Sequence, residues 1–119
     1  MNDAPNDRLT PDAAAVLDAL LDGPGAVLAA LREQVPHVRV AGWCGCGCAT
    51  VDLAVDRSVV AAAPPHDSPV VEGFYGESAH GAGVMLFTSE GYLSGMEIYT
   101  AADEPLTVWP GPGGLTVSA

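Results

Sequence analysis

Three cysteines separated by single glycines are the densest group of reactive side chains in this 119-residue sequence, in the order Cys44-Gly45-Cys46-Gly47-Cys48. In an extended segment, residues two apart point to the same side, so the three thiols could line one edge. Thiolates are soft ligands that suit zinc or monovalent copper. Cysteines this close rarely reach disulfide geometry, so the cluster favours a reduced, cytoplasmic setting.

The cysteine cluster admits three interpretations. A metal site would need a fourth ligand from His37, His66 or His80, and the spacing lacks the two residues usual between paired zinc cysteines. A redox sensor would need a lowered thiol pKa, and Arg39 is the cationic neighbour in sequence. The interpretation that we favour is that small thiols pack as modest hydrophobes in a tight corner. We therefore expect no cofactor, with zinc at the three cysteines as the alternative.

Catalytic motifs do not accompany these residues. The sequence contains no nucleophile elbow, P-loop, dinucleotide-binding fingerprint or His-Glu-x-x-His pair. Composition alone would permit a cysteine–histidine pair, but the segment Ser78-Ala79-His80-Gly81 is typical of a turn. We predict that the chain is not an enzyme and has no catalytic residues.

The charge balance points to the kind of partner. Fifteen acidic residues face four arginines and no lysine, which gives a formal net charge of −11. A negative charge of this size repels the phosphate backbone of nucleic acids. The arginines are scattered and form no basic stripe, so we expect no nucleic-acid binding. A basic protein would be attracted. The same charge also serves solubility, which is the more general explanation.

We predict a partner-binding surface on the last part of the chain, comprising Tyr92, Glu97, Tyr99 and Trp109. Glu97 and Tyr99 would share one side of a strand, and aromatic side chains beside a fixed charge are typical interface anchors. The competing interpretation is that Glu97 is an ordinary solvent-facing residue of a half-buried strand.

The start of the chain, Met1–Asp7, is polar and acidic, unlike the basic beginning and apolar middle of a signal peptide. The longest apolar run is far too short for a membrane span. We expect a cytoplasmic protein that binds no membrane.

Helical spacing of apolar residues predicts two helices near the start. Thr10-Pro11-Asp12 provides a cap, a first-turn proline and a first-turn carboxylate, and the pattern continues to Leu21. Gly23-Pro24-Gly25 ends this helix. A second is expected from about Pro24 to Val35, before Pro36.

The spacing then changes to alternation. We expect a strand around Val38 and Val40, a clear one over Cys48–Asp56, a lone one over Val70–Tyr75 and a hairpin joined at Ser89-Glu90-Gly91; the hairpin strands are 83–88 and 92–100. The glycine-separated cysteines fall between the first two strands. The run 84–87 predicts a central strand covered on both faces, by helices on one side and with a partner as the candidate cover of the other.

This order predicts an α+β fold in which two N-terminal helices pack on one face of a small antiparallel sheet of about four or five strands. We expect residues 1–8 to be disordered, 9–110 to form a single domain, and 111–119 to be a flexible tail. An exposed strand edge would also permit a homodimer.

Several segments carry a resemblance to a known family. They are the start Leu9-Thr10-Pro11, the Cys-x-Cys-Gly-Cys stretch at 44–48, and the Gly-x-Leu-x-x-x-Glu-Ile-Tyr ending at 91–99. Through them the chain resembles a family of small uncharacterised actinobacterial proteins, over roughly residues 8 to 110. The ending is also similar to that of small bacterial domains found near toxin–immunity loci. The resemblance implies a fold type and no established activity.

Taken together, these observations predict a non-catalytic protein-interaction module with an acidic surface, of which an immunity-like protein is one form. The alternative is a metal-binding or redox-responsive protein that uses the cysteine cluster.

Overall fold

The computed structural model describes residues 8–43, 50–75, 82–100 and 114–118. Over these ranges the chain begins with helices α1 (Pro11–Leu20) and α2 (Ala26–Gln34) and the short 3-10 helix η2 (Val35–His37). The strands that follow are β1 (Val38–Trp43), β2 (Val51–Val55), β3 (Val71–Tyr75), β4 (Ala82–Ser89), β5 (Tyr92–Thr100) and β6 (Leu115–Ser118). This confirms the predicted α+β fold.

The start of α1 follows the capping residues in the sequence. The Thr10 hydroxyl accepts a hydrogen bond from the Ala13 backbone N–H at 3.2 Å, and Pro11 occupies the first turn together with Asp12. These residues satisfy or replace backbone donors that a helix start leaves unpaired. The helix buries one face, which consists of Ala13, Val16, Leu17 and Leu20.

The second helix begins two residues later than predicted. Gly25 has a φ of +107°, which is outside the helical region, so α2 starts at Ala26 rather than at Pro24. Its buried residues are Leu28, Leu31 and Gln34. Spacing of three places them on one face, toward the sheet.

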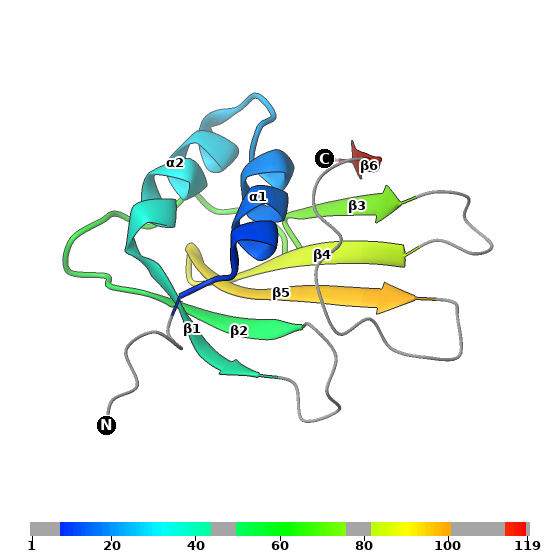
Figure 1. Cartoon of the computed structure of the whole chain (residues 1–119). Helices are drawn as coiled ribbons and strands as arrows, with labels where there is room; N and C mark the ends of the chain where they lie inside the picture. Colours follow the sequence, from blue (N-terminus) through cyan, green and yellow to red (C-terminus); the bar gives the residue numbers. More distant parts are fainter. Residues whose placement is uncertain (1–7, 44–49, 76–81, 101–113, 119) are drawn as a thin grey trace, which may run out of the picture.

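All pairings among the described strands are antiparallel, and the sheet order is β1-β2-β5-β4-β3-β6. Both helices lie on the same side of this sheet (Figure 1), where α2 contacts β5 and α1 contacts β3. The hydrophobic core lies between the helices and the sheet. Fully buried members from both layers include Leu17, Leu20, Leu31, Leu86 and Met96.

The sheet has six strands where the sequence predicted about four or five. The additional strand is β6, which lies within the segment 111–119 predicted to be a flexible tail and pairs with β3 from Tyr75↔Leu115 to Glu72↔Ser118. Its four residues follow a stretch rich in proline and glycine, and so short a strand has little periodicity of its own. Pairing with β3 satisfies the backbone groups of β6 that face β3.

Strand β4 is central and the helices cover one of its faces, as predicted (Figure 1). Val84 and Leu86 are buried against the helices, whereas Met85 and Phe87 between them are partly exposed. Within the described part of the chain, no helix is long and apolar enough to cross a membrane.

A candidate partner-binding face of the sheet

Strand alternation divides the residues of the sheet between the helix side and the opposite side, which we call the open face. The pairs Leu86↔Met96 and Val84↔Ile98 are buried and lie on the helix side. Their neighbours Met85 and Glu97 must therefore point away from the helices.

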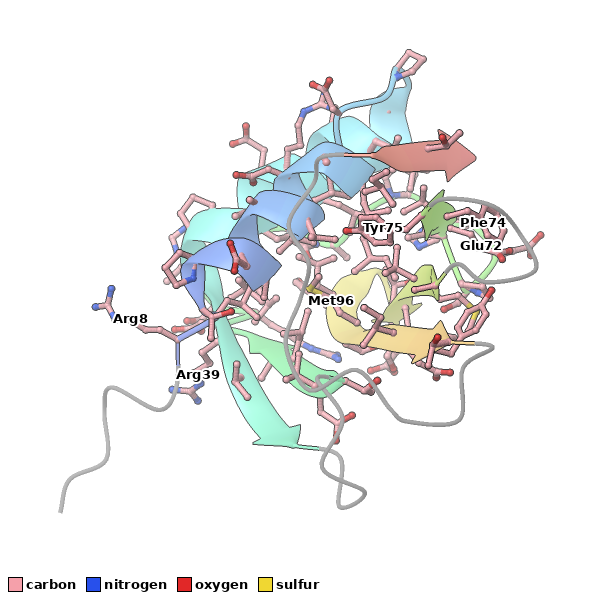
Figure 2. All side chains as sticks on the ribbon, turned by 45° about the vertical axis from the view of Figure 1, so that its right-hand side comes forward. Arg8, Arg39, Glu72, Phe74, Tyr75 and Met96 are labelled. Carbon is pink, nitrogen blue, oxygen red and sulfur yellow. The ribbon has the colours of Figure 1, made fainter. Side chains whose placement is uncertain are left out.

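Five side chains on β3, β4 and β5 form what we call the open-face patch: Glu72, Phe74, Met85, Glu97 and Tyr99. One row of paired residues runs Glu72↔Met85↔Glu97, and the next runs Phe74↔Gly83↔Tyr99. Figure 2 shows Glu72 and Phe74 on the far side of β3 from the helices, whereas Tyr75 and Met96 lie toward them. The patch therefore combines a row with two carboxylates and a row with two aromatic rings.

Gly83 provides room for the aromatic row. A Cβ atom placed on Gly83 would lie 2.2 Å from Cζ of Tyr99 and 2.3 Å from its hydroxyl oxygen. The tyrosine ring therefore lies across the β4 backbone at this point. Even so, Tyr99 is 42% exposed and Phe74 is 44% exposed, so both rings present apolar surface outward.

The carboxylates of the patch carry uncompensated charge. Glu72 and Glu97 are half-buried, yet neither makes a hydrogen bond or an ion pair with any residue that the structure describes. Asp52, which pairs with Gly95 on the same face, adds a third carboxylate beside the patch. Unpaired negative charge on a partly apolar surface attracts a cation.

All four arginines of the chain are among the described residues, and none forms an ion pair with a carboxylate of the open-face patch. Arg32 donates to the carbonyl oxygens of Leu21 and Gly23 after α1. Arg57 pairs with Glu90 at 2.7 Å and lies over the Tyr92 ring, 4.6 Å from its centroid.

The remaining two arginines lie away from the patch. Figure 2 shows Arg8 and Arg39 at the opposite end of the molecule from Glu72 and Phe74. Since the sequence contains no lysine, the chain has no other side chain with a permanent positive charge to offer. Among the described residues, no arginine therefore neutralises the negative charge of the patch.

The predicted partner-binding residues separate into three groups. Glu97 and Tyr99 share the open face, as alternation predicted. Tyr92 lies at the other end of β5, about 23 Å from Tyr99 along an extended strand, and its hydroxyl donates to the Val60 carbonyl at 3.1 Å. Trp109 is outside the described residues.

The described residues do not include the predicted metal site. Cys44, Cys46 and Cys48 are outside the described residues, as is His80, although the prediction that they fall between two paired strands is confirmed by the β1–β2 pairing. Within the described ranges, no group of three or more potential ligand side chains could hold a metal ion.

The two described histidines, His37 and His66, lie at different places in the fold. His37 ends the 3-10 helix η2, directly before β1. His66 is held near the β4–β5 turn, where Nε2 lies 2.7 Å from the Thr88 hydroxyl and Nδ1 lies 2.6 Å from the Pro64 carbonyl. Both ring nitrogens of His66 are engaged.

Among the described residues outside the patch, Asp56 and Tyr75 have shifted pKa values. The Ser58 hydroxyl and backbone N–H both donate to the Asp56 carboxylate and hold the pKa of Asp56 below its usual value, and nearby Arg39 adds a smaller effect. Burial raises the pKa of the Tyr75 phenol. Neither residue belongs to a group that could transfer a proton to a ligand on the open face.

Sequence reasoning missed Glu72, Phe74 and Met85. The alternation of Val71–Tyr75 could have shown that Glu72 and Phe74 share one side of β3. No sequence pattern shows that β3 pairs with β4 at the register that brings these residues beside Met85, because register depends on the tertiary structure.

The chain was compared with protein-family models, with curated proteins and with solved structures, and it matches none of them.

Proposed function

We propose that this protein is a non-catalytic binding module that docks a basic protein partner on the open face of its sheet. The observation that carries the proposal is the open-face patch itself, because helices cover the other side of the sheet and leave exposed aromatic rings beside unpaired carboxylates. Aromatic residues and methionine are the side chains enriched at protein interfaces.

The chemistry of the patch supports recognition rather than reaction. It offers two carboxylates, a phenol, a phenyl ring and a thioether, arranged over three adjacent strands. Paired strands hold such groups in fixed positions, which lowers the entropy lost on binding. Aromatic anchors such as Phe74 and Tyr99 would supply the apolar contact area, while the carboxylates would select the charge of the partner.

Net charge supports a basic partner. A charge of −11 on a chain of this size steers positively charged proteins toward it and slows the approach of acidic ones. The expected association is faster and tighter at low ionic strength, because salt screens exposed charges over about 10 Å at 0.1 M. The apolar contacts on Phe74 and Tyr99 would remain at high salt.

The proposal is tested by comparing three immobilised proteins in an extract of the native host: wild type, F74S/Y99S, and V59S. Val59 is 55% exposed and lies in the β2–β3 connection, so V59S removes an exposed apolar side chain outside the patch. Candidates retained by wild type and V59S but lost by F74S/Y99S are then purified, and their direct binding is measured at several salt concentrations.

The expected result is a basic protein whose affinity falls at least tenfold for F74S/Y99S, remains unchanged for V59S, and decreases with salt. Circular dichroism must show that all three proteins are folded. The proposal fails if no protein distinguishes wild type from F74S/Y99S, or if V59S impairs binding as much as the patch variant does.

A further inference from the structure

We infer that the open-face patch recognises an arginine side chain of the partner, with its guanidinium held between Glu72 and Glu97 above Met85. This inference rests on the proposed function and makes it more specific. The two glutamates flank Met85 on the adjacent strands, so their Cα atoms are about 9.6 Å apart, which is two strand spacings. Side chains of this length can reach inward and leave room for one planar cation between them.

The aromatic row lies beside this position. Tyr99 is two residues beyond Glu97 on β5, and Phe74 is two residues beyond Glu72 on β3, so each ring is about 7 Å further along its strand on the same face. A guanidinium between the carboxylates can contact an aromatic face, where cations are attracted by the ring electrons. The carboxylates and the rings therefore favour the same ligand.

Arginine fits this arrangement better than lysine. Its guanidinium is planar, presents donors on two sides, forms paired hydrogen bonds to carboxylates and stacks on apolar or aromatic surfaces. An ammonium is a compact, strongly hydrated charge that would have to lose water above the Met85 side chain. Calcium is a poor fit, because it takes six to eight oxygen ligands around one point and the patch offers two carboxylates on strands that are not adjacent.

A second copy of the chain is a less suitable occupant. Two molecules that each carry −11 repel one another, and two of the four arginines are already bound to their own chain. The carboxylates of Glu72 and Glu97 are therefore better suited to a different protein that supplies a positively charged side chain. The occupant that fits the patch is a basic segment of another protein with an arginine at its centre.

The test uses three capped pentapeptides, Gly-Leu-X-Leu-Gly, in which X is arginine, lysine or citrulline. Each is titrated into the full chain labelled on its methionine methyl groups. Met85 lies in the patch, whereas Met96 is buried on the helix side and provides an internal reference. Citrulline keeps the shape of arginine but lacks its charge. The variants are E72Q, E97Q and, as a matched control, E33Q on the exposed surface of α2.

The arginine peptide is expected to shift the Met85 methyl resonance and to leave Met96 unchanged. Binding should be roughly three- to tenfold weaker for the lysine peptide and weaker still for citrulline, in line with the strength of charge-assisted hydrogen bonds. E72Q and E97Q should each weaken the arginine peptide by a similar factor, and E33Q should have no effect. The arginine preference should disappear in the double variant E72Q/E97Q.

Equal binding of the three peptides, or an arginine peptide that leaves Met85 unshifted, overturns the inference. The proposed function is tested separately, by whether the F74S/Y99S variant fails to bind a partner that wild type binds. A partner that depends on Phe74 and Tyr99 but binds E72Q/E97Q normally leaves the function intact and refutes the arginine site. Concentration-dependent self-association by sedimentation that disappears in E72Q/E97Q would instead assign the patch to a second copy, and would also refute it.

Discussion

Replacing Gln34 tests how much the hydrogen bonds of its side chain, which join α2 to the start of β5, contribute to stability. Gln34 is fully buried, and its Nε2 donates to the Gly91 carbonyl at 2.8 Å and to the Ala61 carbonyl at 3.2 Å. Its Oε1 accepts from the Leu93 N–H at 2.9 Å. One side chain therefore satisfies backbone groups of both the β4–β5 turn and the β2–β3 connection. We predict that Q34L destabilises the fold although leucine has a similar volume.

The magnitude follows from which groups lose their partner. The Leu93 N–H is buried and would be left without an acceptor, at a cost of about 1–3 kcal/mol. The Gly91 carbonyl keeps a hydrogen bond from the Ala63 N–H at 2.8 Å, and Ala61 is exposed enough to bind water. Added apolar burial offsets part of the loss, so we expect Q34L to lower the free energy of unfolding by about 1–3 kcal/mol.

The variant Q34E tests the hydrogen bonds of Gln34 without changing the shape of the side chain, because ionised glutamate has nearly the same shape as glutamine but no N–H donor. At neutral pH the variant places a buried carboxylate against two carbonyl oxygens, which should cost about 3–5 kcal/mol. The protonated carboxyl can donate to one of them, so the folded state raises the pKa of the introduced group above its unfolded value of about 4.3. The stability of Q34E relative to wild type should therefore be highest below about pH 4.3 and be lost as the pH rises through the folded pKa.

The measurement is urea unfolding followed by circular dichroism between pH 4 and pH 8, with wild type at each pH to remove the effect of the net charge. E33Q, at the adjacent exposed position, should change the free energy of unfolding by no more than about 0.5 kcal/mol. The reasoning is refuted if Q34L is as stable as wild type, or if the difference between Q34E and wild type is independent of pH.

Three further predictions concern the sheet. G91A should cost about 2–4 kcal/mol in chemical unfolding, because its φ is +85° and the new Cβ would lie 2.9 Å from a backbone carbonyl, whereas G114A, with a φ of +81° in open space, should cost only about 1 kcal/mol. G83A should displace the Tyr99 ring, seen as a shift of its ring proton resonances, with the fold retained. Stability should fall as the pH rises above 10.0 through the raised pKa of Tyr75, and Y75F should flatten that loss.

Local sequence signals were sufficient to predict most of the elements. The cap and proline at Thr10–Pro11 mark the start of α1, and the alternation in 51–55 and the turn at Gly91 mark strands that the structure contains. These signals depend on residues close in the chain. Helix ends were less well predicted, since the positive φ of Gly25 moves the start of α2 to Ala26.

Features that depend on residues distant in the chain were not predictable. Strand β6 forms only because β3 offers it an edge, and the role of Gln34 depends on carbonyl groups 27 and 57 residues away. The candidate site was predicted in part: Glu97 and Tyr99 were identified, but Glu72, Phe74 and Met85 reach them only through pairing across β4. Such pairing needs the register, which no single segment specifies.

Exposed apolar residues alone would not justify a binding site, because single ones are common on protein surfaces. The open-face patch differs in that Phe74 and Tyr99 flank Gly83 in one row, and two unpaired carboxylates flank Met85 in the next. An open sheet face that served only stability could carry threonine or neutral polar residues at these positions without leaving half-buried charge unpaired. The patch therefore places apolar contact area and unsatisfied negative charge at the same location, and a cationic side chain from a partner would satisfy both.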